Sequence, residues 1–120
     1  MYSIVYTLKI IHPALMLKPG KYEILTLPPY REWVDSLDWK IQQRVLLRVD
    51  RMRKGQFGDC KSIASGLYEL RMFFGSGYRV YFGEHDGKTV IILAGGDKST
   101  QSRDIKKAKE YWRMHLESLP

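Results

Sequence analysis

The stretch LYELRMFFGSGYRVYF, residues 67–82, decides the fold of this chain because it has the pattern of two strands joined by a glycine-containing turn. Apolar and polar residues alternate on both sides of the GSG, which is the period of a half-buried strand. Gly75 and Gly77 can adopt the positive φ angles that a tight connection needs. The sequence therefore predicts a β-hairpin here.

The register of this hairpin determines where its two arginines lie. A connection with an odd number of residues places the apolar residues on one face and both Arg71 and Arg79 on the other, whereas an even number mixes arginine with methionine in the core. We predict the odd connection. Because like charges opposite each other destabilise a sheet, an anion between the arginines would turn this cost into a binding site. The alternative is two solvated arginines, or one arginine paired with Glu69.

Composition limits the class of protein. A chain of 120 residues forms one domain, and its net charge of +7 suggests an acidic partner such as nucleic acid, an anionic surface or an acidic protein. The single cysteine, Cys60, excludes an internal disulfide and fits the reducing cytoplasm, and we expect its role to be structural or incidental. No stretch reaches the roughly 18 apolar residues of a membrane span, and no signal peptide is expected. We therefore predict a cytoplasmic protein without a membrane partner.

The chain divides into residues 1–18 and residues 19–120. We predict that residues 19–120 form the domain and that residues 1–18 are an extension of it. This extension is an extra strand, a docking arm or the product of an upstream start, since Met16 would serve equally well as a start. The sequence alone leaves these three alternatives open.

The other periodic segments predict an α+β fold. Trp33 and Trp39 are expected to pack in or beside the core, and residues 56–66 are expected to form a loop. The predicted order is strand, two helices forming an antiparallel hairpin, three strands and a C-terminal helix, which indicates a compact antiparallel sheet of about four strands. The elements outside the 67–82 hairpin are a strand at 22–27, helices at 29–37 and 39–54, a strand at 88–96, and a last helix capped by Ser99, Thr100 or Ser102.

A run of glycines and polar residues, GGDKST, follows the last predicted strand. Gly95 and Gly96 would let the backbone approach a ligand closely. If neighbouring strands pair in sequence, Lys98 lies one strand from Arg79, and the two can converge with Arg71 on one polar concavity. Three cations suit a phosphodiester, whose transition state gathers negative charge. The run is not a Walker motif, and neither a metal-ligand spacing nor a serine or cysteine triad is evident, so we expect no metal and no cofactor.

Three segments in order, GLYELR, GSGYRVYF and TVIILAGGDKSTQSRDIKKAKEYW, closely resemble the RelE/ParE toxin superfamily in its HigB-like addiction-module branch. The resemblance covers residues 22–112. It implies a microbial-ribonuclease-like α+β fold and a toxin that cuts mRNA in the ribosomal A site without a metal. The implied partners are mRNA on the ribosome and a cognate antitoxin, often of the helix-turn-helix type.

The resemblance also implies roles for individual residues. Arg71, Arg79 and Lys98 match the basic residues that line the active site, with the arginines stabilising the charge of the phosphorane. RelE itself has a tyrosine near the start of the last helix, proposed as the base, where this chain has Asp104-Ile105, so Asp97 becomes the candidate base. The candidate substrate-binding residues are Gln101, Arg103 and Tyr81.

Two other functions stay open at this point. A gyrase poison of the ParE type would use the same fold, although such proteins generally lack the full basic set. A catalytically inert homologue would bind only the antitoxin. Growth arrest on expression separates the inert homologue from a toxin, and intact mRNA with damaged DNA identifies a gyrase poison.

Overall fold

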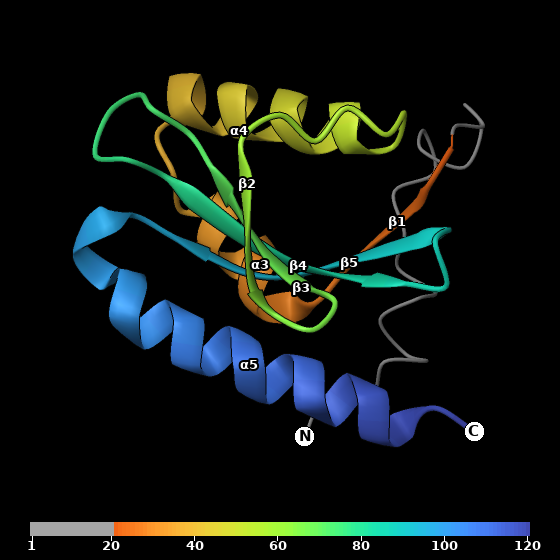
Figure 1. The fold of residues 1–120 in the computed structure, drawn as a ribbon. Coiled ribbons are helices and arrows are strands. Elements are labelled where there is room, and N and C mark those ends of the chain that lie inside the picture. Colours follow the sequence, from red (N-terminus) through yellow and green to blue (C-terminus); the bar gives the residue numbers. More distant parts are fainter. Residues whose placement is uncertain (1–20) are drawn as a thin grey trace.

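The structure is a computed structural model that describes residues 21–120, so the predicted extension at residues 1–18 lies outside the described residues. An α+β architecture is confirmed (Figure 1). The elements in chain order are β1 (Glu23–Thr26), α3 (Pro28–Asp35), α4 (Trp39–Met52), β2 (Cys60–Ala64), β3 (Leu67–Arg71), β4 (Arg79–His85), β5 (Thr89–Gly96), the short 3-10 helix η1 (Lys98–Thr100) and α5 (Gln101–Ser118).

The sheet has five strands in the order β1-β5-β4-β3-β2 and is mixed, because β1 runs parallel to β5 while the other pairs are antiparallel. The prediction of a loop at residues 56–66 was wrong in part, since β2 lies within it. This edge strand has only two half-buried residues, Cys60 and Ile63, so it lacks the alternation that identifies a strand. The parallel β1 was not foreseen because its partner lies at the other end of the domain.

Helices cover both faces of the sheet, with α4 on one side and α5 on the other (Figure 1). Strand β5 contributes side chains to the hydrophobic core on each face of the sheet. Val90 and Ile92 join the core under α3 and α4, whereas Ile91 and Leu93 join the core under α5. The apolar run in this segment is therefore buried on both sides, as predicted.

Helix α4 packs on the sheet through a stripe of buried apolar residues. Asp38 caps it by accepting a hydrogen bond from the Lys40 backbone N–H, and Val45 and Val49 are buried. Trp33 is half-buried against the core as expected, but the expectation for Trp39 was wrong, because its side chain is 69% exposed. Trp39 is the first residue of the helix and lies roughly a third of a turn away from the buried stripe.

Candidate active site

The hairpin of β3 and β4 has the predicted register, and Arg71 lies directly opposite Arg79. The Met72 backbone N–H donates to the Tyr78 carbonyl at 2.9 Å, which leaves the odd connection of residues 73–77. Gly75 and Gly77 have φ angles of 57° and 75°, so both take the positive values predicted for them. Because Met72 and Tyr78 are hydrogen-bonded, the neighbouring pair of Arg71 and Arg79 is a non-hydrogen-bonded pair. In an antiparallel sheet, side chains of such pairs lie closest together.

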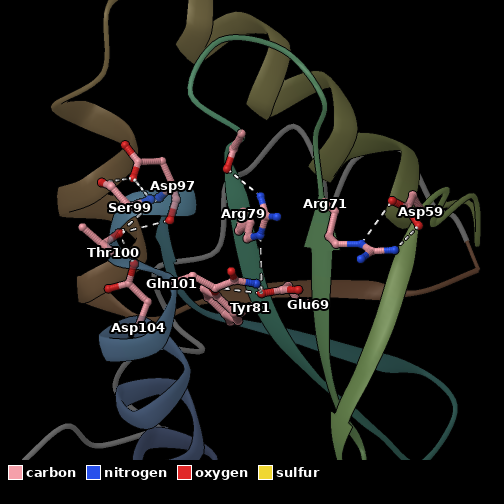
Figure 2. A network of polar contacts seen from close by, with 11 residues as sticks. Asp59, Glu69, Arg71, Arg79, Tyr81, Asp97, Ser99, Thr100, Gln101 and Asp104 are labelled. Atoms are coloured by element: carbon pink, nitrogen blue, oxygen red, sulfur yellow. Dashed lines mark hydrogen bonds and ion pairs between the residues drawn. The ribbon is translucent and has the colours of Figure 1, made fainter.

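Each arginine is paired with its own carboxylate, and the two guanidinium groups point toward different partners (Figure 2). Arg71 donates to both carboxylate oxygens of Asp59, at 3.1 and 3.2 Å, across the surface of the sheet. Arg79 donates from Nη1 to the Gly77 carbonyl at 2.7 Å, and its Nε lies 3.6 Å from Glu69 Oε2. The alternative that one arginine pairs with Glu69 is thus confirmed, and it offsets the cost of placing two cations side by side.

The two arginines differ in how firmly they are held. The Arg79 side chain is 10% exposed, and its Glu69 partner is almost completely buried. The Arg71 side chain is 34% exposed, and hydrogen bonding to Asp59 raises its pKa further. Arg79 is therefore a fixed cation that is almost shielded from solvent. Arg71 and Asp59 are each about one third exposed, so solvent weakens their ion pair and lets it exchange.

Glu69 is the centre of a buried polar cluster that sequence reasoning did not identify as functional. Its carboxylate accepts hydrogen bonds from the Tyr81 hydroxyl at 3.1 Å and the Gln101 side-chain amide at 2.9 Å (Figure 2). Burial, followed by the nearby Glu69 charge, raises the pKa of Tyr81 well above its usual value. Of the two predicted substrate-binding residues here, Tyr81 is fully buried and Gln101 is partly buried, and both are linked to Arg79 through Glu69. In the sequence, this cluster was indicated only by Glu69, a charged residue in an apolar strand, which the predicted hairpin places opposite Tyr81.

Lys98 lies beside Arg79 across the hairpin turn. The Lys98 backbone N–H donates to the Ser76 carbonyl at 3.3 Å, which ties η1 to the turn between β3 and β4. Gly77 separates the two cations, since a Cβ added there would lie 3.2 Å from Arg79 Nη1 and 3.4 Å from Lys98 Cβ. The structure thus brings Arg71, Arg79 and Lys98 to one end of the sheet.

Asp97 is the N-cap of η1. Its carboxylate accepts hydrogen bonds from the Ser99 backbone N–H and hydroxyl (Figure 2). It also accepts one from the Ser76 hydroxyl, at 3.2 Å. These bonds, the Ser99 hydroxyl first among them, lower the pKa of Asp97. Asp97 therefore holds the η1 turn that carries Lys98 and has reduced affinity for a proton.

We expect Asp97→Asn to lower the free energy of unfolding at neutral pH by an amount that shrinks in acid. A lowered folded-state pKa stabilises the protein above the unfolded-state value of about 4, and this stabilisation is lost as the pH falls through the folded-state pKa. Urea unfolding of both proteins between pH 7 and pH 3 measures the difference. A difference that stays the same down to pH 3 would contradict this assignment.

Arg103 does not join the arginine pair. It is exposed on α5 and lies 3.6 Å from Asp104, whose carboxylate also accepts from the Thr100 hydroxyl. Its side chain lines a separate open groove of about 380 Å³ between α3 and α5, together with Trp33 and Lys107. The structure therefore places this predicted substrate-binding residue on a different surface.

The two glycines at the end of β5 make room for the protein's own side chains, so the expectation that they let a ligand approach was wrong. A Cβ at Gly95 would collide with the Trp33 ring, and one at Gly96 would collide with the Asp104 carboxylate. The sheet thus packs against helices on both sides at this point. Sequence alone could not distinguish this packing from a ligand contact, because both require a missing side chain.

Gly95→Ala is accordingly expected to lower the free energy of unfolding by about 1–3 kcal/mol, because Trp33 must move out of a well-packed position. Chemical denaturation measures this loss. Gly87→Ala is the control, since a Cβ there meets no atom within 4 Å and only its φ of 72° opposes the substitution. A Gly95→Ala protein as stable as the wild type would contradict the packing role.

Among residues 21–120, no three or more histidine, cysteine, aspartate or glutamate side chains are grouped so that they could hold a metal ion. Burial raises the pKa of the Cys60 thiol, which makes it a poorer nucleophile. Within the same residues, no helix has the length and apolar character needed to cross a membrane.

Comparison with known proteins assigns the chain to a family. The family described as phage-derived protein Gp49-like (DUF891) matches residues 32–113, a range that contains the arginine pair, the Glu69 cluster and η1. A Haemophilus influenzae protein described as uncharacterised is 43% identical over 88 residues, which are 72% of this chain and 89% of that protein. The chain therefore belongs to the Gp49-like family, a toxin–antitoxin-associated family of toxins of the RelE/HigB type.

Proposed function

We propose that this chain is the toxin of a type II toxin–antitoxin module and that it cleaves mRNA bound in the ribosomal A site. The observation that carries the proposal is the cross-strand pair of Arg71 and Arg79 beside the η1 turn with Lys98. Family membership supports the toxin role and implies a cognate antitoxin as partner, for which we propose a helix-turn-helix protein.

The proposed reaction is transfer of the phosphodiester within the RNA. The 2′-hydroxyl oxygen attacks the adjacent phosphorus, the bond to the 5′-oxygen of the next nucleotide breaks, and the products are a cyclic phosphate and a free 5′-hydroxyl. Negative charge builds on the phosphoryl oxygens along this path, so fixed cations lower the barrier. Arg79, held by Gly77 and Glu69, supplies such a cation with little reorganisation.

Arg71 and Lys98 have more freedom than Arg79. Arg71 can exchange its solvent-exposed contact with Asp59 for a phosphate oxygen. Lys98 is exposed on η1, where its ammonium group can neutralise charge or assist the leaving oxygen. We assign the three cations to the phosphate on these grounds.

The general base stays a prediction. Asp97 was the candidate from sequence, but the bonds that lower its pKa make it a weak proton acceptor, and they suit it to positioning Lys98. Substrate positioning by the ribosome can itself supply several kcal/mol of the rate enhancement. We therefore propose that Asp97 acts on the site mainly through the η1 turn.

The test is to add the purified protein to a bacterial cell-free translation reaction and map the 5′ ends of a reporter mRNA by primer extension. The proposal expects new 5′ ends within codons when ribosomes are present and none in a ribosome-free lane. Cuts in both lanes would keep the ribonuclease and overturn the A-site mechanism. Intact mRNA with folded protein would overturn the proposed function, and supercoiling by gyrase would be measured next.

A further inference from the structure

The tip of the arginine hairpin carries an exposed aromatic ring. Phe73 is 78% exposed, more than any other large apolar residue among residues 21–120. Its neighbour Phe74 packs against the core, with its ring 5.6 Å from that of Tyr78 and 3.8 Å from the Arg44 guanidinium. Consecutive residues of an extended chain point to opposite sides, so Phe73 lies on the side of the sheet that carries Arg71.

Folding does not explain the exposure of this ring. Phe74 and Tyr78 pack against each other and against the core, whereas Phe73 is not part of this core cluster. A single exposed apolar residue is ordinary on a protein surface. Phe73 is distinguished by its neighbour, because the Arg71 guanidinium carbon lies 6.0 Å from the centre of its ring.

A ring beside a cation matches the chemistry of single-stranded RNA. Each nucleotide presents a phosphate that a cation can bind and an unpaired base that can stack on an aromatic face. The other exposed large apolar side chains among residues 21–120 belong to helices, with Trp39, Leu46 and Leu47 on α4 and Leu116 on α5. Phe73 differs from them because it lies on the arginine hairpin, with its ring next to Arg71 of the candidate phosphate site.

We propose that Phe73 is a stacking platform for an unpaired nucleobase next to the phosphate bound by Arg71 and Arg79. The inference rests on the proposed function and adds a base contact to a site that otherwise holds only the phosphate. Stacking is tolerant of base identity, because every base has an aromatic face. Phe73 therefore contributes affinity and register on the RNA, and codon preference must come from other contacts.

The test is single-turnover cleavage of mRNA on programmed ribosomes at increasing toxin concentration, comparing wild type with Phe73→Ala, Phe73→Leu and Phe73→Trp. Loss of one stacked base typically weakens binding about tenfold or more. We expect Phe73→Ala to raise the half-saturating concentration by about tenfold and to leave the saturating rate within a few fold. Phe73→Leu should behave like Phe73→Ala, and Phe73→Trp should behave like wild type.

Trp39→Ala is the matched control, because it removes an exposed aromatic ring from α4 and is expected to leave both parameters unchanged. If Phe73→Ala has the wild-type concentration dependence while Arg71→Ala has lost cleavage, the stacking inference is wrong and the proposed function stands. Full activity of Phe73→Leu would show a contact that needs no ring, which also overturns it. If the wild type cuts no mRNA, both the function and this inference fall.

Discussion

Arg71→Ala is expected to slow mRNA cleavage on the ribosome by about a hundredfold or more while leaving the protein folded. A charge contact that acts on the transition state typically contributes this much. The substitution removes a solvent-exposed ion pair with Asp59, so little stability depends on it. Time courses of primer extension at saturating protein give the rate, and thermal unfolding monitors the fold.

Arg79→Lys should slow cleavage by a similar factor for a geometric reason. A lysine keeps the charge, but its compact ammonium lacks the planar fork with which Arg79 reaches both Gly77 and Glu69. The control is Arg113→Ala on α5, which also removes an arginine with carboxylate partners, Glu110 and Glu117, and should leave the rate unchanged. Wild-type rates for both Arg71→Ala and Arg79→Lys would exclude the arginine pair as the site.

Glu69→Ala is expected to have the largest effect on stability, a loss of about 3–5 kcal/mol in the free energy of unfolding. The substitution leaves the buried Arg79 cation without its carboxylate and removes the acceptor for both Tyr81 and Gln101. Removing one member of a buried pair costs far more than the pair itself contributes. Equilibrium unfolding in urea measures the loss.

Asp59→Ala is the comparison for Glu69→Ala, since Asp59 is the carboxylate that pairs with Arg71, and its side chain is 37% exposed. We expect it to cost no more than about 1 kcal/mol. Replacing Glu69 and Arg79 together by methionine should give a more stable protein than Glu69→Ala alone, because no buried charge remains unpaired. Equal losses for Glu69→Ala and Asp59→Ala would refute the burial argument.

The hairpin was predictable because a strand has a strict period of two. Once the odd connection was chosen, that period fixed the faces of Tyr68, Leu70 and both arginines. Strand β2 was not predictable, since an edge strand with one half-buried isoleucine shows almost no period. Local pattern also carries no information on the direction of β1, which depends on a partner far along the chain.

The cations of the candidate site were predictable from sequence, and the pairing of one arginine with Glu69 was among the alternatives, but the other partners were not predictable. Arg71 and Arg79 stood out as charges on a strand, and Lys98 followed from its place after β5. Asp59, the partner of Arg71, lies in a segment without periodicity, and Gln101 reaches Glu69 from another element of the fold. The sequence could therefore suggest candidate phosphate-binding residues, whereas the structure was needed to show how Arg79 is held.

The parallel pairing of β1 with β5 has a consequence for folding during synthesis. Hairpin β3–β4 closes a short loop, whereas Glu23 must meet Thr89, and long-range contacts form more slowly because more chain entropy is lost. Strand β1 leaves the ribosome well before its partner strand β5 has been synthesised. Ile24 and Leu25 therefore have no core to pack against at that stage. The strand that is synthesised first is thus expected to join the sheet last. The meander of β3, β4 and β5 is expected to form first and to act as the folding nucleus onto which β1 docks.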